Sequence, residues 1–483
     1  MSSDTGPRLF DRRQVLALSG AVMAGMAGCT APGQRSDDGT GDGTGDGNGD
    51  GTGGAGDGTG DGGGLPPVDP PAFPELDLVT DPDIEEAALA EQIRGNVAFA
   101  LELLEALREE SPDENLFFSP YSVSIALAMT YAGARESTAD EMAAALNFEL
   151  EDDELHAAMG ALEAEFERRN EDGQTVETPD VPGEDDDPDG PAFEFTTANA
   201  TWGEETMAFE EAFLDLLETY YEAGMRLVDF QGSPEEAREE INAWVAEQTE
   251  DLIDELLPDG SIDHQTRLVL TNAIYFHAMW QYPFDEGKTE PGTFTALDGS
   301  ETEVPMMHQS IEVPYAEIDG HQVVELPYAN EDSSMVIVLP AEGEFETFEA
   351  ELSVDVLATL LEETSRPEVD LTIPAFEIET QASLVETMEA LGMELPFTGG
   401  ADFSGMTGDA SLFIDDILHE AVIEVDELGT EAAAATAVIM MESGPIDHAE
   451  MTVDRPFLFY IRDRPTETPL FVGRVVDGEE LDG

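Results

Sequence analysis

Few side chains of this chain stand in a pattern that enzymes use for catalysis. The sequence has no GxSxG nucleophile elbow, no phosphate-binding glycine loop and no HExxH zinc motif. Its seven histidines are scattered along the chain: His156, His264, His277, His308, His321, His419 and His448. A Ser/His/Asp triad is compatible with this order, because triads are defined by geometry, but no serine stands on a predicted strand-to-helix turn. We therefore expect a protein that is not an enzyme and that has no metal site and no cofactor.

The segment 419–443, HEAVIEVDELGTEAAAATAVIMMES, has the most unusual pattern of the chain. A predicted strand at 421–425 is followed by a glycine at 429 and then by a run of small residues. One interpretation of this run is an Ala-rich helix, because alanine is the best helix former and Thr430 is a suitable N-cap.

The same run is also compatible with a strand. Every second residue from Thr430 to Met440 is uncharged, and Glu431 falls on the opposite face. Such a strand could enter the middle of an existing sheet without burying a charge, with Gly429 as its hinge. Composition does not decide between the helix and the strand.

The elements that would position this segment belong to an α+β domain from 82 to 483. Apolar residues at helical spacing predict helices at 84–108, at 121–146 in two parts divided near Gly133 and capped at Ser137, and at 235–257. Apolar runs predict strands at 268–276, 322–326, 335–339, 369–373 and 421–425, and PFLFYIRD and LFVGRVV predict a C-terminal hairpin. The acidic, Pro/Gly-rich residues 169–191 are interpreted as a surface insertion.

The N-terminus has the features of an export signal. Arg12 and Arg13 precede a short apolar stretch at 15–26, and Ala27-Gly28 lead into the single cysteine, Cys29. Residues 1–28 therefore resemble a twin-arginine signal joined to a lipoprotein processing site, which implies lipid on the sulfur of Cys29. An N-terminal helix with a buried thiol is the alternative. We expect an exported protein, either secreted or held at the extracellular face of the cell membrane by this lipid anchor.

Residues 29–81 are predicted to be a flexible tether, because 33–64 consist almost entirely of Gly, Asp and Thr and a Pro-rich stretch follows. Asp46 to Gly51 match the start of an EF-hand loop, which raises calcium binding as an alternative. However, position twelve is Asp57 rather than Glu, and no apolar helix flanks the loop. A spacer is the interpretation that we adopt.

The charge balance is extreme. The 483 residues include 109 Asp and Glu but only 18 Lys and Arg, Lys288 being the single lysine, which gives a net charge of −91. Such a surface repels phosphate backbones and anionic headgroups, so we expect no binding to nucleic acid. In molar salt the Debye length falls to roughly 3 Å and most of the self-repulsion disappears. We interpret the charge as the adaptation of a halophile, and we expect the fold to be lost at low salt.

Four motifs in order resemble the serpin family of serine protease inhibitors. They are NLFFSPYS at 115–122, TNAIYFHAMW at 271–280, ELGTEAAAAT at 427–436, and DRPF at 454–457 together with LFVGR at 470–474. The resemblance covers roughly 88–480. It implies the serpin fold, an α+β fold with three β-sheets, about nine helices and an exposed reactive loop.

The resemblance also implies a suicide-substrate mechanism. A serine protease attacks the loop and forms an acyl-enzyme, and the cut loop then inserts into the central sheet and traps the protease. By motif, the loop hinge comprises Glu427, Gly429, Thr430, Glu431, Ala432, Ala433, Ala434, Ala435 and Thr436. The family's polar cluster beneath the central strands, and the aromatic where the loop first enters, correspond to Ser119, Ser122, Asn272, His419 and Trp280. These residues are structural gates rather than catalysts.

Family spacing counted forward from Gly429 places the scissile bond at Ser443–Gly444, whereas counting back from Pro456 places it near Pro445. The neighbouring specificity candidates are Met440, Met441 and Glu442. None of these residues is basic, so we expect a partner protease with an apolar or small pocket, of the subtilisin, chymotrypsin or elastase type. We also expect a monomer.

Two departures from the family pattern are visible. Leu428 replaces a residue that is usually polar or charged, and His277-Ala278-Met279 replace the usual lysine-containing run. The alternative function is a non-inhibitory serpin-fold binding module at the cell surface. The short, neutral hinge residues favour the inhibitor, because a non-inhibitory relative need not keep them.

Overall fold

A computed structural model describes residues 74–481, apart from 75, 79, 81, 83, 174, 177, 180–190, 198, 222–224, 250–251, 254, 409–411 and 431–447. The predicted signal, Cys29 and the EF-hand-like segment lie outside the described residues, as does most of the predicted tether. So do the loop residues 431–447, which include the predicted scissile bond.

The described residues form ten α-helices and three short 3-10 helices. The α-helices are α2 (Glu86–Glu110), α3 (Pro120–Tyr131), α4 (Glu136–Ala145), α5 (Asp152–Gly173), α6 (Glu211–Tyr220), α7 (Pro234–Gln248), α8 (Phe345–Glu351), α9 (Val354–Glu362), α10 (Val385–Ala390) and α11 (Ser404–Thr407). The 3-10 helices are η1 (Glu286–Lys288), η2 (Leu395–Phe397) and η3 (Glu479–Leu481). The first residues of the segment interpreted as an insertion, 169–173, continue helix α5.

The strands form three sheets, so the predicted α+β fold is confirmed. The first has the order β1 (Leu116–Phe118), β17 (Thr468–Val475), β16 (Phe457–Asp463), β10 (Ser333–Leu339), β9 (His321–Pro327), β8 (Tyr315–Ile318). The second has the order β15 (His448–Thr452), β11 (Glu368–Pro374), β7 (Glu301–Glu312), β6 (Glu290–Thr295).

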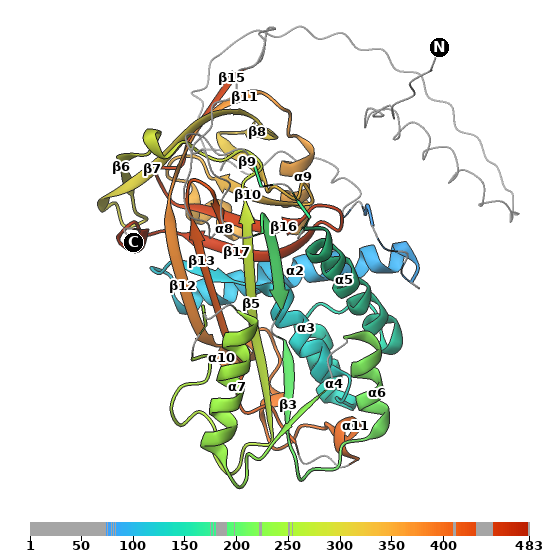
Figure 1. The fold of residues 1–483 in the computed structure, drawn as a ribbon. Coiled ribbons are helices and arrows are strands. Elements are labelled where there is room, and N and C mark those ends of the chain that lie inside the picture. The colour runs from blue at the N-terminus through green and yellow to red at the C-terminus, as the bar shows by residue number, and fades with distance from the viewer. Residues whose placement is uncertain are drawn as a thin grey trace, which may run out of the picture. The chain divides into compact units, whose positions relative to one another are not determined.

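The third sheet carries the site described below. Its order is β12 (Phe376–Ser383), β13 (Leu418–Val425), β14 (Gly429–Thr430), β5 (Leu268–Met279), β3 (Ala200–Glu204), β4 (Arg226–Val228), and β2 (Phe193–Thr197) also pairs with β5. Figure 1 shows β12, β13 and β5 as long, nearly aligned strands, with α7 in front of them and α2 behind. The sheet is therefore covered on both faces.

Each face of the third sheet has its own apolar contacts. On one face α3 packs against both β5 and β17, so it lies between the first and third sheets inside the main core. On the other face Ile241 and Val245 of α7 pack with Trp202 of β3 in a second cluster. Helix α3 begins at Pro120, a residue that is favoured in the first turn of a helix. Ser119 is its N-cap, because the Ser119 hydroxyl accepts the Ser122 N–H at 3.2 Å.

The predicted strands are all present, and β16 and β17 form the predicted hairpin. Two local predictions were wrong. Ser137 does not cap α4, because this helix already begins at Glu136. The helix predicted at 235–257 ends at Gln248, since the Thr249 hydroxyl donates to the Val245 carbonyl and accepts the Ile253 N–H. The described residues from Leu252 to Leu257 are not helical, and the Asn242 side chain binds the N–H and carbonyl of Leu257.

Candidate functional site

The third sheet contains a strand position that is only partly filled. Strands β13 and β5 pair directly, in parallel, at Leu418–Glu420 with Thr271–Ala273. Farther along, the two-residue strand β14 lies between them: Thr430 pairs with Val425 on one side and with Ala278 on the other. Between these two places the described residues show no ladder pairing of β13 with β5. Two residues of the predicted loop hinge, Gly429 and Thr430, therefore already belong to the sheet.

A tight turn at 426–429 brings β14 into this position. The Asp426 N–H donates to the Gly429 carbonyl at 3.0 Å, and Asp426 Oδ1 accepts the N–H groups of Leu428 and Gly429 at 2.8 and 3.0 Å. A Cβ atom at Gly429 would lie 2.2 Å from the Ala278 carbonyl oxygen. Only glycine fits this close approach between backbones.

An aromatic pair holds the end of β14. Trp280 and Tyr328 stack with their ring centroids 4.7 Å apart and an interplanar angle of 6°. The Trp280 indole N–H donates to the Asp426 carbonyl at 3.0 Å, and its backbone N–H donates to the Leu428 carbonyl at 2.7 Å. The hydroxyls of Tyr328 and Thr430 form a buried hydrogen bond of 2.8 Å. The predicted role of Trp280 at the start of the inserted segment is thus consistent with its position.

The other predicted gate residues form one hydrogen-bonded cluster where β13 and β5 pair. His419 Nδ1 donates to Asn272 Oδ1 at 2.5 Å, and the Asn272 amide donates to the Ser122 hydroxyl at 2.7 Å. The Ser119 backbone N–H donates to His419 Nε2 at 3.1 Å, while its hydroxyl donates to the Leu470 carbonyl at 2.7 Å. The sequence prediction of this cluster was made by motif alone, and the structure brings all four residues together.

The cluster fixes the protonation of His419. Its Nε2 accepts the Ser119 N–H and is buried, so a proton there would remove this hydrogen bond and place a charge away from solvent. Burial lowers the pKa of His419 from 6.5 to about 4. The opposite shift occurs at the turn, where burial, reinforced by Glu427 and Glu424, raises the pKa of Asp426 to about 7 against the opposing effect of its two backbone N–H bonds.

Three functional candidates were missed by the sequence motifs. Asn199 accepts the Ser122 hydroxyl at 2.6 Å and the Asn272 amide at 3.1 Å, so it completes the polar cluster. Tyr328 and Asp426 complete the hinge. Asn199 lies at the break between β2 and β3, and Tyr328 directly follows β9, where no motif pointed to them. Asp426 could have been found, because aspartate is typical of the first position of a turn that precedes a glycine.

The family departures noted in the sequence are accommodated. Leu428 is buried in a small apolar cluster with Ala192 and Met279. The carbonyl of Ala278 lies against Gly429, where no residue with a Cβ atom would fit. The remaining hinge residues, Glu431 to Thr436, and the loop candidates from Met440 to Gly444 lie outside the described residues.

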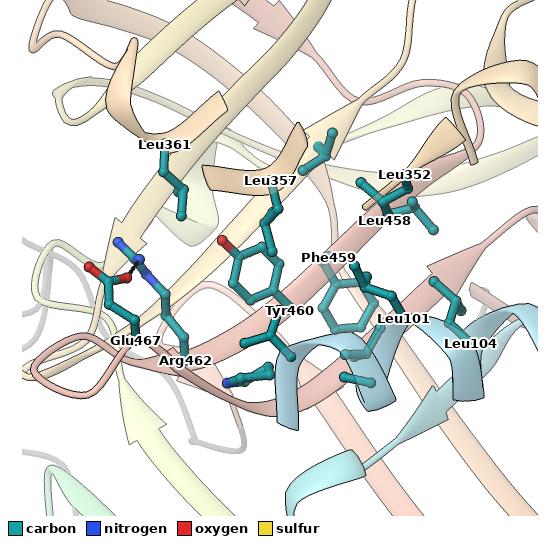
Figure 2. A pocket seen from close by; sticks show the side chains of 15 residues that line it. Leu101, Leu104, Leu352, Leu357, Leu361, Leu458, Phe459, Tyr460, Arg462 and Glu467 are labelled. Carbon is teal, nitrogen blue, oxygen red and sulfur yellow. Dashed lines mark hydrogen bonds and ion pairs between the residues drawn. The ribbon is translucent and has the colours of Figure 1, made fainter. Parts of the chain in front are cut away.

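Other features of the described residues offer less chemistry. A small apolar cavity of about 30 Å³ lies between α2, α9 and β16, lined by Leu101, Leu357 and Tyr460 among others (Figure 2). This volume holds one or two water molecules at most. Within the described residues, no group of three or more His, Cys, Asp or Glu side chains is arranged to hold a metal ion. No helix there is long and apolar enough to cross a bilayer.

Comparison with known proteins agrees with this geometry. A family model described as "Serpin (serine protease inhibitor)" matches residues 94–478. An uncharacterized serpin-like protein of Thermococcus kodakarensis is 36% identical over 371 residues, which are 76% of this chain and 82% of that protein. Leukocyte elastase inhibitor A of Mus musculus is 38% identical over 390 residues, covering 79% and 97%. The solved structure of human thyroxine-binding globulin complexed with its ligand has a TM-score of 0.67 at 30% identity, covering 81% and 99%.

Proposed function

The chain belongs to the serpin family, and we propose that it inhibits serine proteases as a suicide substrate, by insertion of its cleaved reactive loop between β13 and β5. The observation that carries this proposal is strand β14. It supports the proposal because Gly429 and Thr430, the hinge residues that the structure describes after the turn, already pair with β5.

The register of β14 predicts how far insertion proceeds. Thr430 lies opposite Ala278, and the pairing is antiparallel, so each further loop residue meets the preceding residue of β5. Thr436 would then lie opposite Asn272, at the level of the polar cluster. Insertion beyond that point must separate His419 from Asn272, since these two residues now pair directly. The polar cluster is therefore the gate of the reaction.

The chemical step belongs to the protease. Its serine Oγ attacks the carbonyl carbon of Ser443, the C–N bond to Gly444 breaks, and the new amine of Gly444 takes its proton from the protease's general acid. The inhibitor remains as an ester on the protease serine. Insertion of the free loop end then competes with hydrolysis of this ester. The uncharged residues at alternate positions from Thr430 onward let the strand enter without burying a charge.

The target class follows from the loop composition. No basic residue occurs from Met440 to Gly444, so a protease with an apolar or small pocket, of the subtilisin, chymotrypsin or elastase type, is the proposed partner. Relatives named as leukocyte elastase inhibitors support an elastase-type partner. We propose that the inhibitor acts as a monomer, because the reaction requires one loop and one sheet of the same chain.

The proposed location is outside the cell. Residues 1–28 would be the export signal, Cys29 would carry the lipid, and 29–81 would hold the domain at a distance from the membrane. The charge of −91 would keep that domain soluble in molar salt and away from anionic headgroups. The membrane contact would then be the lipid anchor alone.

The test uses the chain from residue 75 to 483 in molar salt, mixed with subtilisin-, chymotrypsin- and elastase-type proteases. Denaturing gels are expected to show a band near the summed masses, and mass spectrometry is expected to find a released peptide that begins at Gly444. A peptide that begins at another residue within two positions of Gly444 would assign the scissile bond to that position instead. Cleavage of the loop without a stable band, for every protease tested, would contradict the inhibitory mechanism.

A second candidate is a non-inhibitory serpin-fold binding module at the cell surface. It is favoured by one observation, the 30% identity to a structure of thyroxine-binding globulin that contains a small ligand. The same gels separate the two candidates, because a binding module would be cleaved without retaining the protease. The inhibitor is preferred because β14 is already paired in the sheet.

A further inference from the structure

The acidic insertion and both departures from the family pattern meet beside the loop hinge. Leu428 and Met279 belong to the two departures, and they form a buried apolar cluster with Ala192, the residue that directly follows the insertion at 169–191. Val176, from the first part of the insertion, packs against the same cluster. The turn from which the hinge enters the sheet therefore shares one apolar cluster with residues from both ends of the insertion.

The first part of the insertion is fixed to the third sheet. Gly173, the last residue of α5, lies so close to β2 that a Cβ atom there would stand 2.5 Å from Cδ1 of Phe193. The Val176 N–H donates to the Gly173 carbonyl at 3.1 Å, so Val176 lies only one turn beyond this contact. The packing of α5 on β2 thus sets the position of Val176 beside the hinge.

The end of the insertion is fixed to β5. His277 Nε2 donates to the Pro191 carbonyl at 3.0 Å, and the Met279 N–H donates to the Ala192 carbonyl at 3.0 Å. The same part of β5 carries the hinge, because Met279 also pairs with Gly429. Strand β5 therefore holds the hinge along one edge and the residues that follow the insertion along the other.

We propose that the insertion is a clasp for the reactive-loop hinge, and that Leu428 is the positioning residue through which it keeps Gly429 and Thr430 in the sheet. This inference rests on the proposed function and assigns the insertion a part in it. Leu428 is the only apolar side chain of the turn at 426–429, and it is 1% exposed. Its carbonyl also accepts the Trp280 N–H at 2.7 Å, so the side chain and the backbone of one residue both fasten the turn.

The clasp favours the states in which the hinge lies in the sheet. If the turn moved out, Leu428 would lose its apolar contacts and meet water, which is unfavourable. Loop insertion adds strand residues after Thr430 and leaves the turn before it in place, so the same contacts persist in the inserted form. Contacts between apolar side chains are not screened by salt as ion pairs are, so the clasp also acts in molar salt.

The first test measures amide hydrogen exchange by mass spectrometry, on the full chain in molar salt. L428A should raise the exchange rate at 426–430 by about tenfold, because most of the buried apolar side chain is removed. V176A should raise the exchange rate at the same residues by about threefold, since Val176 is smaller and only half-buried. This second variant tests the proposal even where L428A does not fold. L428M keeps an apolar side chain and should retain the wild-type exchange.

L227A is the matched control, because Leu227 lies in the edge strand β4 and is 52% exposed. It should leave exchange at 426–430 unchanged. The effects of L428A and V176A should be less than additive in the double variant, because either change opens the same clasp. Exchange that rises only near residue 176 in V176A, or effects that add in full, overturns the proposal.

The second readout is the covalent complex with the protease on denaturing gels. L428A should give more cleaved chain and less complex than wild type, whereas L428M and L227A should match wild type. Faster hinge exchange in L428A with an unchanged yield of complex overturns the role of the clasp in inhibition. Coupled exchange without any complex of the wild type leaves the clasp standing and overturns the inhibitory function instead.

Discussion

The hydroxyl groups of Tyr328 and Thr430 lie 2.8 Å apart, and this hydrogen bond attaches the first strand residues of the hinge to the aromatic pair of Tyr328 and Trp280. Both hydroxyls are buried, so each depends on the other for its hydrogen bond. The bond joins β14 to the residue that follows β9, and thus couples the loop to the first sheet as well as to the third.

Replacing Thr430 with arginine should convert the inhibitor into a substrate. The change removes the bond to Tyr328 and places a charge at a position that is 2% exposed, which costs on the order of several kcal/mol. Insertion slows, and the acyl-enzyme hydrolyses first. Denaturing gels should show cleaved chain in place of the covalent complex. T295R, at an exposed position of β6, is the control and should retain the complex.

Replacing Gly429 with alanine should also displace β14. The added methyl would stand 2.2 Å from the Ala278 carbonyl, so backbone must move, at a cost of roughly 1–3 kcal/mol. We expect fewer covalent complexes per cleavage event and a change in the emission of Trp280, whose two N–H groups bind the turn before Gly429. G399A is the matched control, because a Cβ at Gly399 meets no atom within 4 Å. Equal behaviour of both variants would contradict the close approach.

His419 should make the fold sensitive to acid. Its pKa is lowered from 6.5 to about 4 in the folded state, so between these values the unfolded chain binds the proton more tightly. The stabilisation is complete above about pH 6.5 and is lost as the pH falls toward 4, by roughly 3 kcal/mol in total. Chemical unfolding at several pH values should show this loss as a difference between wild type and H419Q.

The control for this measurement is H264Q, since His264 lies on the surface and contacts the Gln231 carbonyl. The difference between wild type and H264Q gives the pH dependence that follows from removing an exposed imidazole, and the loss attributed to His419 should exceed it. If the difference in unfolding free energy between wild type and H419Q does not change with pH, the lowered pKa of His419 is contradicted. The many carboxylates affect all three proteins alike, so they cancel in the differences.

Removal of salt should unfold the protein. With a net charge of −91, most carboxylates lack a cationic partner, and only screening limits their repulsion. Near-UV circular dichroism should decrease as sodium chloride is lowered from molar to millimolar concentration. Sucrose at equal osmolality should fail to restore the signal, because it does not screen charge. A signal unchanged at low salt would contradict the proposed halophilic adaptation.

The fold was predictable where sequence pattern and tertiary structure agree. Strands β13, β16 and β17 lie where the apolar runs placed them, because buried strands leave continuous apolar segments. The helix predicted to reach 257 ends at Gln248. The side chains of Thr249 and Asn242 accept the backbone N–H groups of Ile253 and Leu257, which would otherwise bind helical carbonyls. Tertiary hydrogen bonds of this kind leave no periodic trace in the sequence.

The site was predictable to the extent that its residues lie in quoted motifs. Ser119, Ser122, Asn272 and His419 met as expected, although they come from three separate segments. Asn199 was missed, because its role depends on a break between two strands that the sequence does not mark. The strand interpretation of the hinge is supported at Thr430, whereas composition does not decide between helix and strand for the alanines that follow, which lie outside the described residues.

The antiparallel register of β14 also sets a minimum length for a successful cut. A strand that starts at Thr430 reaches the level of Asn272 only at Thr436. A loop cut before that residue is therefore too short to reach the polar cluster. Such a fragment would leave the hydrogen bond between Asn272 and His419 intact, and β13 and β5 would stay paired at Leu418–Glu420. Proteases that cut early in the loop would thus escape, and those that cut late would be retained. The distance between hinge and cut, rather than the fit of any pocket, would then discriminate captured enzymes from enzymes that merely destroy the inhibitor.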